Sequence, residues 1–107
     1  MLNKLKEALE GTGYAFAHFG WSKAPAGDYG VYAEDSGEDL VANDRHIEKG
    51  TRCYVHLFTR DDSTTPQKAV ESALNGLQTP WYLNTVQFEA DTGYIHYEWE
   101  VGLYGEL

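Results

Sequence analysis

The sequence predicts a single α+β domain, in which two helices pack on one face of a mostly antiparallel β-sheet and a β-hairpin closes the chain. Residues 51–60 and 94–101 alternate in side-chain character as strands do. Residues 2–10 and 65–77 have instead the apolar spacing of helices. Most connections between the expected strands are short and carry turn residues, which suits hairpins. A chain of 107 residues usually forms one domain, so residues 1–107 are expected to fold together.

The N-terminal part is expected to form one helix and then two short strands. The apolar side chains of the first segment, residues 2–10, share one helical face: Leu2, Leu5, Ala8 and Leu9. Strands are expected over residues 14–19 and 30–35. Pro and Gly mark residues 22–29 between them as a loop. After a turn, residues 39–43 are expected to pair back as a hairpin arm.

The strongest predicted strand covers residues 51–60, near the middle of the chain. One side of it carries small and aliphatic side chains and the other carries rings: Cys53, Val55 and Leu57 against Tyr54, His56 and Phe58. Bulky side chains on both sides are typical of a central strand that is covered on both faces. The helix over residues 65–77 can cover the aliphatic side. The ring-bearing side is therefore expected to pack on other strands or to become buried when subunits meet.

The C-terminal part is expected to form a helix and a hairpin. Thr65 is the expected N-cap and Pro66 the first helical residue. In the strand expected over residues 81–89, alternation places three side chains on one side: Tyr82, Val86 and Phe88. In the strand over residues 94–101, four side chains are expected to point into the core: Ile95, Tyr97, Trp99 and Val101. Residues 102–107 are expected to form a loose tail.

Residues that could catalyse a reaction or bind a metal are scattered. The four histidines lack the spacing of a metal site: His18, His46, His56 and His96. Cys53 is the only cysteine and is predicted to be a small core residue. Glu98 and Glu100 share one side of a strand, which is more typical of a solvated face than of an acid–base pair. We therefore expect no enzymatic activity, no metal and no cofactor.

Charge is the clearest bias in the composition. There are 17 acidic and 8 basic residues, and the net charge of −9 disfavours a nucleic-acid-binding surface. No signal peptide or membrane-spanning segment is predicted, and folding in a reducing cytoplasm is expected. Five carboxylates cluster around one turn: Glu34, Asp35, Glu38, Asp39 and Asp44. This cluster either keeps a loop soluble or forms a surface that meets a basic partner or repels DNA.

Four segments, taken in order, resemble the small tail terminator, or tail completion, proteins of long-tailed (siphovirus-like) bacteriophages and prophages. The segments are YGVYAED, LVANDRHIEKGTRCYVHLFTRDD, AVESALNGL and WYLNTVQFEADTGYIHYEWEV. Together with the amphipathic N-terminal helix, they cover nearly the whole chain. The shared features are a tyrosine-bearing strand ending in an acidic pair, an aromatic–aliphatic strand leading into Asp-Asp, and an acidic, aromatic closing hairpin. The order and spacing of the segments carry the resemblance.

The resemblance implies a virion structural protein with an α+β fold. Such a protein assembles as a hexameric ring on the finished end of the tail tube. There it ends tube polymerisation and forms the surface that joins the head–tail connector, or stopper, protein. The expected location is therefore the head–tail junction, after synthesis in the host bacterial cytoplasm. Viral DNA would pass through the ring without specific binding, past a lumen that the acidic cluster would line.

Aromatic residues are the expected contacts in such an assembly. Trp21, Trp81 and Tyr82 flank loops and are predicted to meet other subunits or the tail tube, although Trp side chains at such positions also cap core ends. Tyr54 and Phe58 join this set if the ring-bearing side of the central strand is buried on assembly. The neighbouring alternatives are another neck or connector protein and a tail tube subunit. An alternative of a different class is an acidic module that mimics DNA and binds a DNA-binding protein.

Overall fold

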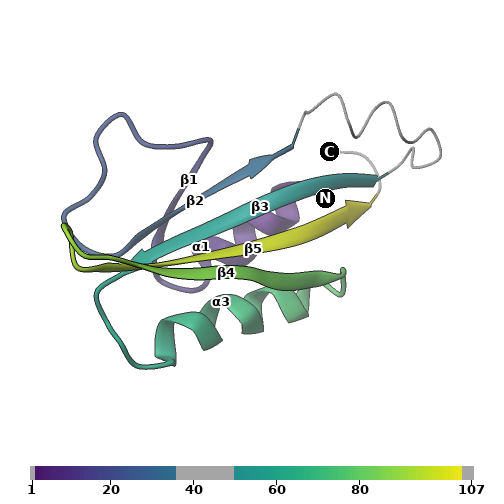
Figure 1. Cartoon of the computed structure of the whole chain (residues 1–107). Helices are drawn as coiled ribbons and strands as arrows, with labels where there is room; N and C mark the ends of the chain where they lie inside the picture. Colours follow the sequence, from purple (N-terminus) through teal and green to yellow (C-terminus); the bar gives the residue numbers. More distant parts are fainter. Residues whose placement is uncertain (1, 36–49, 105–107) are drawn as a thin grey trace.

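The computed structural model describes residues 2–35 and 50–104 of the chain. In chain order the elements are α1 (Leu2–Glu10), β1 (Ala15–His18), β2 (Tyr29–Glu34), β3 (Gly50–Thr59), α3 (Thr65–Gly76), β4 (Trp81–Glu89) and β5 (Tyr94–Tyr104). The strands form one five-stranded sheet in the order β1-β2-β3-β5-β4, with β3 at its centre (Figure 1). The α+β fold class and the central strand are therefore confirmed.

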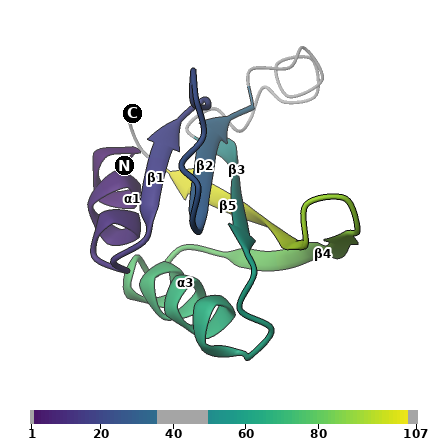
Figure 2. The same cartoon turned by 90° about the vertical axis from the view of Figure 1, so that its left-hand side faces the viewer.

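Both helices lie on the same side of the curved sheet (Figure 2). The apolar stripe of each helix is fully buried: Leu5 and Leu9 from α1, Val70 and Leu74 from α3. These side chains join one core cluster with the inward residues of β3 and β5, such as Val55, Leu57 and Trp99. Each fully buried aliphatic side chain contributes roughly 1.5–3 kcal/mol of transfer free energy. This core cluster therefore lies on the helix side of the sheet, whereas the buried ring of Tyr94 lies on the other side.

The first two strands run parallel, whereas all the other neighbours in the sheet are antiparallel. The expectation of hairpin connections is wrong for this pair, because residues 19–28 return along the sheet before β2 begins. The contact that fixes β1 is the ring of Phe16 lying over Gly30. A Cβ atom at Gly30 would be 2.1 Å from a ring carbon of Phe16, so only glycine leaves room for this ring. The absence of a side chain at Gly30 in β2 thus allows Phe16 to pack there and positions β1.

Strand β4 contains a β-bulge that reverses part of its alternation. The register shifts between Leu83 and Thr85, and Tyr82 pairs with Glu100 whereas Val86 pairs with Tyr97. One extra residue in a strand turns every later side chain to the other face. The expectation that Tyr82, Val86 and Phe88 share a side is therefore wrong. Val86 and Phe88 lie on the helix side, and Tyr82 on the other.

The strand β5 is longer than expected. It continues to residue 104, Leu103 is fully buried, and the backbone N–H of Gly102 donates to the carbonyl of Pro80 at 2.9 Å. Residues 102–104 are therefore sheet rather than loose tail. The expected N-cap is also displaced, because α3 begins at Thr65 and Thr64 precedes it without a side-chain cap. The hairpin arm expected over residues 39–43 lies outside the described residues.

Candidate interaction surface

The side of the sheet away from the helices is called the open face below. Alternation of the paired strands assigns its side chains: Tyr29, Val31, Ala33, Arg52, Tyr54, His56, Phe58, Tyr82, Thr85, Gln87, Glu89, Tyr94, His96, Glu98 and Glu100. Neither α1 nor α3 covers this face (Figure 2). Most sheets of α+β domains leave one face to solvent, but that face is then mainly polar. Here its middle is aromatic.

Rings form a continuous row across β2, β3 and β5 on the open face. The ring of Phe58 is stacked on Tyr29, with centroids 4.8 Å apart, and on His96 at 4.2 Å. Tyr94 meets the rings of Tyr29 and Phe58 edge-on. His56 continues the row, because its Nδ1 lies 2.9 Å from Nε2 of His96. Tyr94 is buried and the other rings of the row are partly buried, so the face is ordered before any partner binds.

Two histidines of the open face, His56 and His96, share one hydrogen bond. One of the facing nitrogens donates and the other accepts, which two imidazolium rings cannot do. Burial and the neighbouring His96 lower the pKa of His56, and Glu98 opposes this shift. On the far side of the pair, His96 Nδ1 lies 3.6 Å from a carboxylate oxygen of Glu89. Full protonation of the pair would therefore break its hydrogen bond and place two positive charges together.

The carboxylates of the open face are engaged by neighbouring side chains. Glu100 accepts a hydrogen bond from the Tyr82 hydroxyl at 2.8 Å and lies 3.3 Å from Nε of Arg52. Nη1 of the same arginine lies 3.6 Å from Asp35. Glu98 accepts from the side-chain amide of Asn84 at 3.3 Å. Because Glu98 and Glu100 are held by separate partners, they form part of a mixed polar and aromatic surface.

One end of the open face is fixed by contacts among three loops. The guanidinium of Arg60 lies 3.9 Å from the centroid of the Tyr94 ring and donates to the carbonyls of Ala26 and Thr92. The Tyr94 hydroxyl donates to the carbonyl of Gly27 at 2.9 Å. These contacts tie the β1–β2 connection to the end of β3 and to the β4–β5 turn. The sequence pattern marked this connection as a loop and gave no sign of its attachment.

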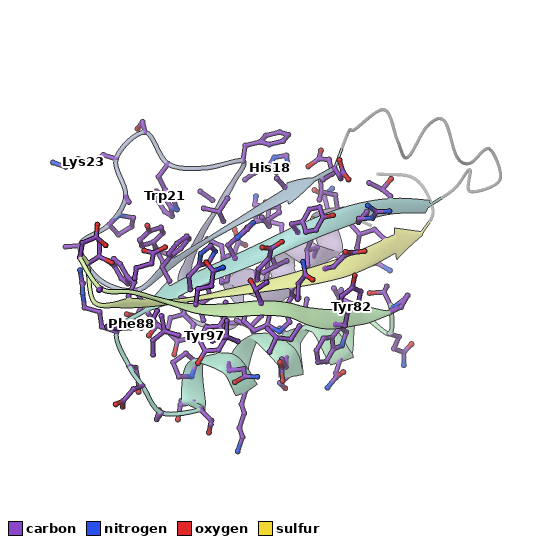
Figure 3. All side chains as sticks on the ribbon, viewed as in Figure 1. His18, Trp21, Lys23, Tyr82, Phe88 and Tyr97 are labelled. Carbon is purple, nitrogen blue, oxygen red and sulfur yellow. The ribbon has the colours of Figure 1, made fainter. Side chains whose placement is uncertain are left out.

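The predicted interface residues divide into two groups. Tyr54, Phe58 and Tyr82 all lie on the open face, and Tyr82 is 53% exposed. Trp81 lies on the helix side, where its indole N–H donates to Asn75 at 2.9 Å, so it closes the end of the core. Trp21 lies on the β1–β2 connection, 36% exposed, with its indole N–H donating to the carbonyl of Gly30 (Figure 3).

The two described members of the predicted acidic cluster, Glu34 and Asp35, lie on opposite faces of the sheet. Glu34 points to the helix side, where Oε1 lies 2.6 Å from Nε2 of His18. Burial raises the pKa of the Glu34 carboxyl, but hydrogen bonding to His18 and the backbone more than offsets this, so the pKa lies below its usual value. Asp35 follows on the opposite face beside Arg52. The remaining members, Glu38, Asp39 and Asp44, lie outside the described residues.

The chemistry of a catalytic or metal site is weakly represented. No group of three or more His, Cys, Asp or Glu side chains within residues 2–35 and 50–104 could hold a metal ion. Cys53 is fully buried, and burial raises the pKa of its thiol to about 12, so it stays protonated at neutral pH.

Among the described helices, none has the length and apolar character needed to cross a membrane. Comparison with protein-family models and with curated proteins found no match.

Proposed function

We propose that this protein is a structural subunit of a long-tailed bacteriophage, a terminator that caps the tail tube as a ring and joins it to the head. The observation that supports this most is the open face, an ordered aromatic surface that neither helix covers. Aromatic side chains are enriched at protein contacts relative to the rest of a protein surface. The order of the sequence segments resembles that of tail terminator proteins, and from this resemblance we infer that the contact is made within a phage tail.

The composition of the open face suits a protein partner. Tyr and His rings combine apolar area with a polar atom, and paired carboxylates and an arginine surround them. An aromatic centre with a polar rim is the usual anatomy of a protein interface. A nucleic-acid partner is disfavoured because the carboxylates of the face, Glu89, Glu98 and Glu100, outnumber its arginines, Arg52 and Arg60, and carboxylates repel phosphates.

The charge of the whole chain supports the passage of DNA without capture. With a net charge of −9, a ring of such subunits would repel the phosphate backbone rather than bind it. The partners in this proposal are further copies of the chain, the tail tube protein on one side and the head–tail connector on the other. The protein is then part of the virion at the head–tail junction.

Electron microscopy with tail tubes tests this function. The protein is added to tubes assembled from the tube protein encoded in the same phage genome. We expect a cap at one end of each tube and an arrest of lengthening. Tyr54→Lys on the open face should abolish capping, whereas Ser72→Lys on the exposed side of α3 makes the same charge change and should leave it intact.

Other results would contradict the terminator function. Incorporation along the whole tube would identify a tube subunit instead. A protein that never associates with itself or with tubes, yet is captured by a DNA-binding protein, would fit the acidic DNA mimic. The pairing of Glu100 with Arg52 and Tyr82 disfavours that alternative, because a DNA mimic needs free carboxylates over one continuous face.

A further inference from the structure

The large apolar side chains that the structure leaves exposed lie at the two opposite edges of the sheet. Among the described residues, five are exposed: Phe19 at 66%, Trp21 at 36%, Tyr82 at 53%, Val86 at 51% and Phe88 at 68%. The first two directly follow β1, which forms one edge, and the other three lie on β4, which forms the other. Figure 3 shows Trp21 on one side of the sheet and Tyr82 and Phe88 along the opposite strand.

Apart from its β-bulge, the edge strand β4 has few of the features that normally protect such a strand. Its nine residues contain no Lys, Arg or Pro, and Glu89 at the end is the only charged one. Edge strands of soluble proteins are usually short or carry such residues, because their free N–H and C=O groups otherwise pair with another chain. Val86 and Phe88 add exposed apolar area on the helix side. On the open face Tyr82 lies beside the polar side chains of Thr85, Gln87 and Glu89, so the exposed apolar area of β4 lies mainly on the helix side.

At the other edge, the chain holds one aromatic ring out to solvent. Phe19 has a backbone φ of 71°, which is rare for a bulky residue, and its N–H donates to the carbonyl of Tyr32 at 2.8 Å. Its ring is stacked on His18 at 4.2 Å, and His18 is in turn stacked on Tyr32 and bonded to Glu34. Backbone strain that the surroundings maintain is a recurrent mark of functional positions.

We propose that β4 of one copy pairs with the β1 edge of the next copy, so that the sheet continues from subunit to subunit. The β1 edge here means β1 together with Phe19 and Trp21. This inference rests on the proposed ring and names its self-contact. A head-to-tail contact buries both exposed sets at once and closes into a ring when the rotation suits. A contact between two β4 strands would bury only one set and leave Phe19 and Trp21 in water.

Side-chain facing and charge agree with this pairing. Through the registers of the sheet, Phe16 of β1 is level with Val86 of β4, and both lie on the helix side. A continued sheet therefore keeps the helix layers of neighbouring copies on one side. The exposed cation Lys23 lies at the same end of the molecule as the β4–β5 turn, which carries Asp91 (Figure 3). The junction thus brings the cation Lys23 toward the carboxylate Asp91.

Native mass spectrometry of edge variants tests the contact. Val86→Lys with Phe88→Lys blocks β4, and Ala15→Lys with Phe19→Lys blocks the β1 edge, because lysine protects edges. All four positions are exposed, so the monomer should stay folded, as circular dichroism would verify. Asn3→Lys with Ser72→Lys makes the same charge change on exposed helix positions and is the matched control. Phe88→Lys and Phe19→Lys alone serve if a double variant does not fold.

Mixing the two blocked proteins gives the sharpest outcome. Each should be a monomer where the wild type and the control form the oligomer, with self-association weakened at least about tenfold. Together they should form a one-to-one dimer that grows no further, because each retains the edge that the other lacks. If either blocked variant forms rings, or if the mixture forms no dimers, the proposed edge contact is wrong. These results would not contradict the proposal that the protein forms a ring. A wild type that stays monomeric with and without tail tubes would overturn the ring itself.

Discussion

Replacing Gly30 by alanine tests how the first strand is attached to the sheet. A Cβ atom there would lie 2.1, 2.4 and 2.6 Å from three carbons of the Phe16 ring. Carbon atoms pack at about 3.5–4.0 Å, so the ring has to move by more than about 1 Å. Phe16 is part of the layer between sheet and helices, where there is little room for such a shift. The substitution should therefore displace Phe16 and loosen β1.

The expected loss can be estimated from two opposing effects. Overpacking of this kind costs about 1–3 kcal/mol, and three contacts under 3.0 Å place Gly30→Ala near the upper end. Alanine returns about 0.4–1 kcal/mol by reducing the entropy of the unfolded chain. The net loss is about 2 kcal/mol, which lowers the melting temperature of a domain of this size by about 8 °C.

Urea denaturation and thermal melting would measure this loss, and a double-mutant cycle identifies its cause. Phe16→Ala alone should destabilise the protein, because a partly buried ring is lost. Adding Gly30→Ala to Phe16→Ala should stabilise the protein by about 0.4–1 kcal/mol, since the clash is gone and only the entropy gain remains, giving a coupling energy of about 3 kcal/mol. If Gly30→Ala is neutral or stabilising in the wild-type background, Phe16 does not lie over Gly30 and the placement of β1 is wrong.

Three further outcomes are expected. The pKa of histidine in the unfolded chain is 6.5 and that of native His56 is lower, so the unfolded state binds the proton first as the pH falls. The free energy of unfolding, measured by urea denaturation, should therefore fall between pH 7.5 and 5.5, and should fall less in His56→Gln. Cys53 is buried with a thiol pKa of about 12, so iodoacetamide at pH 8 should leave the native protein unmodified and label it in denaturant; rapid labelling of folded protein would show that the site opens. Phe58→Gln should impair ring assembly more than monomer stability in size-exclusion and melting experiments, whereas Leu57→Gln on the adjacent, fully buried position should unfold the monomer; equal effects would mean that the open face serves folding alone.

Much of the fold could be predicted because strands with a strong alternation of apolar and polar side chains keep the expected sides in the folded protein. The inward side chains of β5 were assigned correctly, since Trp99 and Val101 are fully buried on the helix side. The aliphatic side of β3 was expected to lie under a helix, and Val55 and Leu57 are fully buried in one cluster with residues of both α1 and α3. The open face was recognised as lacking a helix, because the sequence contains no third amphipathic segment to cover it.

What could not be predicted depends on contacts between distant residues. The parallel pairing of β1 with β2 rests on the fit of Phe16 over Gly30, which no local pattern reveals. The bulge at Asn84 changes which face Val86 and Phe88 occupy, and one inserted residue leaves no periodic sign in a nine-residue strand. Trp81 was expected either at an interface or at the end of the core, and the hydrogen bond from its indole N–H to Asn75 on α3 could not be read from the sequence.

The parallel pair at the start of the sheet has a consequence for direction. In a fully antiparallel sheet with five strands, the two outermost strands would run the same way. The one parallel pair, β1 with β2, makes β1 and β4 run in opposite directions. A second copy set beside the first in the same orientation would therefore meet it through antiparallel strands, the pairing that is slightly more stable per residue. Copies joined in this way all have the same orientation, so a closed ring of them has two different faces. Each face can contact a different partner along the axis of the ring.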